Sequence, residues 1–174
     1  MHYFRLRQDP DYSRAPAIPE VITRIDRRQA VPEKAHHIAP TTVLPLGGKA
    51  VYDFIDLLDR PLFLVSDELQ QVLKLYMPKL TFKTIVLADP ARKEQHIYYL
   101  PIFAPIDCLS DNSLQTPDKR TVKHLVLKGA AIENHTVFRV QHPYETIIIV
   151  RLDVAESILR RDLRGIRLDR VKIE

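Results

Sequence analysis

Glycine, cysteine and long apolar runs are all scarce in this sequence. The four glycines, at positions 47, 48, 129 and 165, cannot form either glycine-rich phosphate-binding loop, G-x-x-x-x-G-K-[ST] or G-x-G-x-x-G. The single cysteine, Cys108, has no partner for an internal disulfide, which fits a reducing compartment. No apolar run approaches the roughly 18 residues that span a bilayer. We therefore expect a soluble cytoplasmic protein that does not contact a membrane.

Histidine and serine are present but form no known metal or catalytic pattern. The seven histidines lack the i, i+4 helical spacing and the cysteine-rich surroundings that metal sites need. Ser110-Asp111-Asn112 matches the S-D-N element of penicillin-recognising enzymes, but no serine is followed by lysine three residues later. All three residue types favour turns, so we interpret the tripeptide as a loop. The sequence predicts neither a metal site nor a cofactor.

Cys108 is the one candidate nucleophile. It follows Asp107, and it would become a reactive thiolate if His96 or His124 lay within hydrogen-bonding distance and lowered its pKa. A lone cysteine between two apolar residues is more typical of a small buried side chain. A small enzyme centred on Cys108 is therefore kept as an alternative to a non-enzymatic protein.

Composition and charge indicate a globular protein. With 45% hydrophobic and 28% charged residues, the chain is long enough for one core and too short for two ordinary domains, so we expect a single domain over residues 1–174. The net charge is +4, but the 26 basic residues are interleaved with 22 acidic ones. Interleaving weakens a single-sign field, which makes a nucleic-acid partner the less favoured interpretation.

The segment 8–48 differs from the rest because proline punctuates it. Proline fixes φ and removes a backbone donor, so we expect an extended arm with short pieces of structure at most. Ile18, Val21, Ile22 and Ile25 give this arm apolar side chains with which to dock on the domain. The prolines are Pro10, Pro16, Pro19, Pro32, Pro40 and Pro45.

Residues 61–87 have the pattern strand, helix, strand. The apolar run 62–65 suits a buried strand, and Ser66 follows it as a helix N-cap with two acidic residues in the first turn. Apolar residues then recur at helical spacing until Pro78, which prevents continuation. An apolar strand pattern completes the unit.

Residues 147–173 have the same order of elements. The run 147–150 predicts a buried strand, and Asp153 is the expected N-cap of the next helix, with Glu156 completing a capping box. Gly165 is placed to end that helix in the left-handed conformation, before a last strand.

The two units align with each other when the first is moved forward by 86 positions. Leu64 then falls on Val150, and Asp67 falls on Asp153. The second strand of each unit interrupts its two-residue alternation at the same point, and a shared β-bulge there would account for the interruption. The alignment predicts an internal repeat of two strand-helix-strand units.

Further strand candidates at 96–103, 122–127 and 136–140 lie between the two units. They predict an antiparallel meander that connects the units. The sequence as a whole therefore predicts an α+β fold built on one mixed, largely antiparallel sheet, with the proline-rich arm in front of it.

The densest group of basic residues lies near the end of the sequence. Arginines in such a group can contact the phosphates of a nucleic acid or the acidic surface of a partner protein. The alternative is that these arginines only form the solvent-exposed faces of the last helix and strand and bind no partner. The candidate partner-binding residues are Arg160, Arg161, Arg164, Arg167 and Arg170.

The segment 64–73, with the sequence LVSDELQQVL, resembles a signature of bacterial polymorphic-toxin immunity proteins, immunity family eleven. The ending LRGIRL at 163–168 resembles that family's closing turn and strand, and 98–101 and 107–109 resemble a mid-chain element. The second unit departs from the signature, because Arg151-Leu152-Asp153 replaces valine, serine and an acidic residue. The resemblance implies a cytoplasmic protein that binds a cognate toxin encoded nearby and blocks its active site. The alternatives are a nucleic-acid-binding regulator and the small enzyme centred on Cys108.

Overall fold

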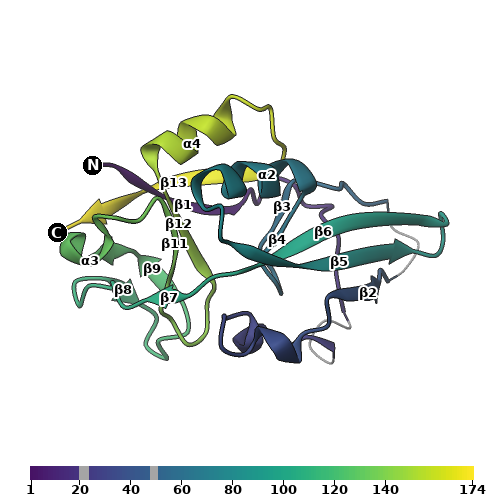
Figure 1. The fold of residues 1–174 in the computed structure, drawn as a ribbon, viewed down its shortest axis with the longest axis horizontal. Helices are drawn as coiled ribbons and strands as arrows, with labels where there is room; N and C mark the ends of the chain where they lie inside the picture. The colour runs from purple at the N-terminus through teal and green to yellow at the C-terminus, as the bar shows by residue number, and fades with distance from the viewer. Residues whose placement is uncertain (20–23, 48–50) are drawn as a thin grey trace.

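The computed structural model describes residues 1–19, 24–47 and 51–174, and it has two main β-sheets with two helices that lie side by side along them (Figure 1). The predicted α+β class is confirmed. The prediction of one sheet is wrong, because six strands form one sheet, five form another and two form a small separate ribbon. The predicted meander is wrong for the same reason, since the strands after β6 leave the five-stranded sheet.

The five-stranded sheet has the order β2-β5-β6-β4-β3. Its longest strands, β5 and β6, form a hairpin whose turn contains Pro90. Its strands are β2 (Thr41–Pro45), β3 (Leu57–Leu58), β4 (Leu64–Val65), β5 (Thr81–Asp89) and β6 (Glu94–Ile102).

The six-stranded sheet has the order β10-β13-β1-β12-β11-β7, and the remaining two strands, β8 and β9, pair with each other. The strands of the larger sheet are β1 (Tyr3–Gln8), β7 (Pro105–Ile106), β10 (Val126–Leu127), β11 (Val137–Val140), β12 (Ile147–Arg151) and β13 (Ile166–Ile173). The small ribbon consists of β8 (Leu114–Gln115) and β9 (Val122–His124), and the short helix α3 (Gly129–Ile132) follows β10.

The five-stranded sheet and five strands of the larger sheet share one topology. In the orders β2-β5-β6-β4-β3 and β10-β13-β1-β12-β11, the first pair is parallel and the next three are antiparallel in both sheets. The central strand is β6 in one sheet and β1, from the other end of the sequence, in the other. A duplicated unit would produce this arrangement, and the duplication itself stays a prediction.

Two buried tyrosines occupy matching places in these sheets. Tyr98 lies on the central strand β6, and its hydroxyl donates to the carbonyl oxygen of Ile55 at 2.7 Å. Tyr3 lies on the central strand β1, and its hydroxyl donates to the carbonyl oxygen of Ile132 at 3.0 Å. Ile55 lies just before β3 and Ile132 lies before β11, the last strands in the two orders compared above. Each bond therefore joins the central strand to the segment before the last strand, and it satisfies a hydroxyl group that burial would otherwise leave unpaired.

The predicted β-bulges are wrong, because β5 pairs with β6 and β13 pairs with β1 in continuous register. The alternation is interrupted because each strand changes the face that it buries. The first half of each strand packs against the helices, whereas the second half packs on the opposite face of the sheet. Residues on the helix side are Leu80, Phe82, Ile166 and Leu168, and residues on the opposite side are Ile85, Leu87, Val171 and Ile173.

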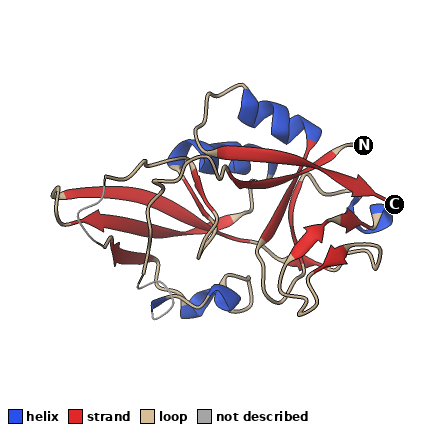
Figure 2. Ribbon diagram, turned by 180° about the vertical axis from the view of Figure 1, so that it is seen from behind, coloured by secondary structure: helices blue, strands red, loops and turns tan. Residues whose placement is uncertain are grey.

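The helices α2 (Asp67–Tyr76) and α4 (Leu152–Leu159) pack against each other on the same side of both sheets (Figure 2). Ser66 caps α2 as predicted, because its Oγ accepts a hydrogen bond from the backbone N–H of Leu69 at 3.2 Å. The predicted N-cap of α4 is wrong. Arg151 is the N-cap residue, and the carboxylate of Asp153 in the first turn pairs with its guanidinium at 2.7 Å.

The segment 8–48 combines short helices with a strand. It contains the 3-10 helices η1 (Arg27–Gln29) and η2 (Ala35–His37) besides β2, and Ile18 and Ile25 are buried in the core under the five-stranded sheet. Residues 21 and 22, two of the predicted docking positions, lie outside the described residues. The separate character of the proline-rich arm stays a prediction.

Candidate functional sites

The first three arginines of the predicted C-terminal group lie around the end of α4. Arg160 pairs with Glu156 at 3.7 Å, and Arg161 donates to the side-chain and backbone oxygens of Ser157. The guanidinium of Arg164 lies 5.8 Å from the ring centre of Tyr12. Arg160 and Arg161 therefore contact side chains and backbone of the helix α4, and Arg164 faces the N-terminal segment.

The other two arginines lie on β13. Arg167 pairs with Asp169 at 2.8 Å, and Arg170 contacts the ring of His2 at 2.9 Å. Positions 167 and 170 differ by an odd number along a regular strand, so their side chains leave opposite faces of the sheet. The five arginines do not form one surface, and their role in partner binding stays a prediction.

Cys108 is completely buried in the cluster that β12, β13 and α3 form with their neighbours. Burial, together with the charge of Asp107, raises the pKa of its thiol to about 11. One of its two candidate partners, His96, contacts Glu94 and stacks on Phe54 instead. The environment therefore opposes the thiolate that a nucleophile requires.

The raised pKa of Cys108 predicts a specific pH dependence of stability. Because the folded protein holds this proton more tightly than the unfolded chain does, the stabilisation is complete below about pH 9 and is lost as the pH rises toward 11. We expect Cys108→Val to remove an alkaline loss of up to about 3 kcal/mol. Urea unfolding of both proteins at several pH values measures the difference. Identical pH profiles, or rapid alkylation of the native thiol at pH 7, would contradict the burial.

The S-D-N tripeptide has a structural contact. Ser110 Oγ and Asn112 Nδ2 donate to the side-chain carboxylate of Glu174, the second bond at 2.7 Å. These bonds lower the pKa of the carboxyl group of Glu174. The loop thus holds the end of β13, and no group of three potential metal-binding side chains occurs among residues 1–19, 24–47 and 51–174.

On the side of the five-stranded sheet that carries α2, strands β5 and β6 extend beyond the end of that helix (Figure 1). Nine side chains from β2, β5 and β6 form the surface there, and we call it the outer face. None of them is buried, and none is charged. They are Thr41, Val43, Pro45, Thr84, Val86, Ala88, Gln95, Ile97 and Tyr99.

The centre of the outer face is a row of three branched aliphatic residues. Val43, Val86 and Ile97 lie directly opposite one another on the three neighbouring strands. Val43 is 46% exposed and Ile97 is 55% exposed. In a chain with 28% charged residues, nine neighbouring exposed or half-buried positions without a charge are unusual. Contiguous exposed apolar surface of this kind is typical of protein-binding sites.

A second feature is a basic pocket of about 420 Å³ on the other sheet, which we call the arginine pocket. Arg5 and Arg7 come from β1, Arg27 from η1, Arg60 from the β3–β4 connection, and Arg120 from the β8–β9 turn. Its two carboxylates, Asp59 and Glu145, leave a formal excess of three positive charges among these seven side chains.

The two carboxylates of the arginine pocket are engaged by the backbone. Asp59 accepts a hydrogen bond from the N–H of Gln8 at 3.0 Å, and Glu145 accepts one from the N–H of Val122 at 2.8 Å. Glu145 also pairs with Arg5 at 3.4 Å, where both side chains are mostly buried. These acids therefore stabilise the walls of the pocket and only partly neutralise its arginines.

Several arginine donors in this region lack partners. The Nε atoms of Arg7 and of the nearby Arg139 are buried and make no hydrogen bond in the described part of the chain. Burial, and then the charge of Arg27, lowers the pKa of Arg139. Leaving a buried donor unpaired costs about 1–3 kcal/mol, more for a charged group. The protein thus carries an unfavourable concentration of positive charge at this point.

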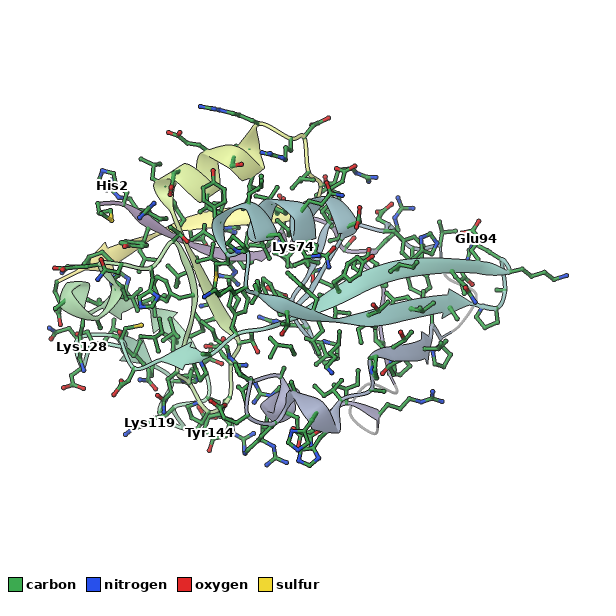
Figure 3. All side chains as sticks on the ribbon, in the orientation of Figure 1. His2, Lys74, Glu94, Lys119, Lys128 and Tyr144 are labelled. Atoms are coloured by element: carbon green, nitrogen blue, oxygen red, sulfur yellow. The ribbon has the colours of Figure 1, made fainter. Side chains whose placement is uncertain are left out.

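The rim of the arginine pocket carries an aromatic ring. Tyr144 is 49% exposed, and the guanidinium of Arg120 lies 5.6 Å from its ring centre. Figure 3 shows that Tyr144 is far from Glu94, the start of β6. The arginine pocket and the outer face are therefore separate surfaces.

No protein-family model matches this chain, and no curated protein matches it either. The resemblance to immunity proteins therefore rests only on the short sequence segments described above. None of the helices within the described residues has both the length and the apolar character that a membrane crossing requires.

Sequence reasoning missed both surfaces. The arginine pocket joins five segments that are far apart in the chain, and no spacing rule connects them. The outer face had a weak signal: Val43, Val86 and Ile97 alternate with buried residues, and each would be assigned to a half-buried strand.

Proposed function

We propose that the chain is a non-enzymatic immunity protein that binds and neutralises a cognate bacterial toxin through the outer face. The observation that carries this proposal is the uncharged row in which the exposed Val43 and Ile97 flank the half-buried Val86. The sequence resemblance supplies the class of partner.

The outer face has the composition of the centre of a protein interface. Such centres are depleted in charged residues and enriched in apolar and aromatic ones, and a polar rim excludes water around them. Here Tyr99 and Ile97 stand on a long, regular hairpin, whose pairing with two further strands holds the backbone fixed. A rigid, flat surface loses little conformational entropy when it is covered, which favours stable inhibition.

The alternatives have less support in the geometry. A regulator that uses the C-terminal arginines to bind nucleic acid needs one basic surface, and Arg167 and Arg170 point away from each other. An enzyme centred on Cys108 needs a thiolate, and the thiol lies in the core with a raised pKa. Neither feature favours these activities over binding.

The proposal is tested by co-expressing the chain with the product of the gene beside its own. We expect a toxic product whose effect on growth is prevented by this chain, and a purified complex of the two proteins with fixed stoichiometry. A neighbouring toxin that neither binds the chain nor is neutralised by it would contradict the proposal.

A further inference from the structure

We propose that the arginine pocket binds a small phosphorylated molecule with two or more negative charges. This inference goes beyond the proposed function, because it concerns a different surface and does not require a toxin. It rests on the charge of the pocket, on the geometry of its guanidinium donors and on its size.

The charge of the arginine pocket is only partly neutralised from within the protein. Five arginines face two carboxylates, and both carboxylates are held by backbone N–H groups. Arg60 has no carboxylate partner within ion-pairing distance among the described residues, in contrast to Arg5, Arg7 and Arg120, which pair with Glu145, Asp169 and Asp118. Asp118 and Asp169 lie outside the lining of the pocket, and within the lining a ligand with two or three negative charges would complement the formal excess of three.

The donors of the pocket suit phosphoryl oxygens. A guanidinium presents a planar fork of N–H groups that binds two oxygens of one phosphate, and several guanidiniums can share a phosphoryl group. Arg5 and Arg7 lie two residues apart on β1, so their side chains leave the same face of the strand toward the pocket.

The size of the arginine pocket favours a small molecule over a protein segment. A volume of about 420 Å³ falls within the range of typical small-ligand sites. Its walls come from β1, η1 and three connections between strands, so the arginines converge on one place and do not extend along a track. The half-exposed ring of Tyr144 on the rim offers a surface on which a planar group of the ligand can stack.

The neighbouring histidine, His142, holds the loop that carries Tyr144. Burial is the main cause that lowers its pKa, Glu145 raises it, and Arg27 and Arg5 lower it. Its Nδ1 accepts hydrogen bonds from the N–H groups of Tyr144 and Glu145, which fixes the loop that carries the ring. The loop is therefore positioned before a ligand arrives.

Isothermal titration calorimetry with pyrophosphate and with ADP tests the proposal on the complete chain. We expect both to bind, with ADP the tighter because of Tyr144. Arg60→Gln combined with Arg120→Gln should weaken the binding of both compounds by at least about ten-fold.

The matched control is Arg160→Gln combined with Arg161→Gln, which removes the same charge from the exposed end of α4. It should change affinity by less than about two-fold. Thermal melting of each variant confirms that it is folded.

Four results would overturn this assignment. One is the absence of heat with either compound at about 1 mM and low ionic strength. Another is equal weakening by the pocket variant and the control, which would indicate general charge attraction. The third is citrate binding as tightly as pyrophosphate, which would make the site a general polyanion site. The fourth is a single-stranded oligonucleotide that binds more tightly than ADP, which would indicate a nucleic-acid surface.

Discussion

Replacing Gly165 by alanine should lower the free energy of unfolding by about 2–4 kcal/mol. Gly165 has φ of +75°, in the left-handed region that costs other residues about 1–2 kcal/mol. A Cβ atom there would also lie 2.5 Å from Cβ and Cδ1 of Ile55, which is buried. The left-handed conformation was predicted correctly. Its role was not, since α4 ends at Leu159 and Gly165 directly precedes β13.

The matched control for this substitution is Gly47→Ala. Among the described residues, a Cβ atom at Gly47 would meet only Pro19, at 3.6 Å, an ordinary van der Waals distance. We expect this variant to unfold at nearly the urea concentration of the original protein. Equal midpoints for the two variants would mean that the contact between Gly165 and Ile55 is looser than the structure indicates.

Ile97→Lys should reduce affinity for the toxin by at least about 30-fold, or about 2 kcal/mol, and should abolish protection of growing cells. The substitution places a charge at the centre of the uncharged outer face, where a bound partner would desolvate it. Ile97 is 55% exposed in the free chain, so its replacement should leave the fold intact. Competition binding and growth with co-expressed toxin measure the two effects.

Leu159→Lys is the control for that prediction. Leu159 is 72% exposed on α4, away from the outer face, and the substitution adds the same charge. Full protection by this variant and none by Ile97→Lys would locate the interface. Loss of protection by both variants, or by neither, would contradict the assignment of the outer face.

Local features of the fold could be predicted because neighbouring residues determine them. Ser66 caps its helix with a side chain three residues from its partner, and the strand at 166–173 follows from two short alternating runs within eight residues. The predicted cap at Asp153 failed because a competing local contact, the ion pair with Arg151, occupies that carboxylate. Prediction therefore succeeded where one local interaction prevailed.

Features that depend on the far ends of the chain could not be predicted. The interruption of alternation in β5 and β13 suggested bulges, but it arises because each strand crosses from one core to another. The division into two sheets depends on β1 pairing with β12 and β13, more than 140 residues away. The arginine pocket depends on the same pairing, since β1 supplies Arg5 and Arg7.

The most direct test of the account is thiol labelling at the outer face in the complex with the toxin. Cys108 is buried, so Ile97→Cys would provide a single accessible thiol, and Leu159→Cys would provide one on α4. We predict that bound toxin slows labelling at position 97 by at least about ten-fold and leaves position 159 unchanged. Labelling at position 97 that proceeds equally fast with and without bound toxin would contradict the central claim that the outer face is the binding surface.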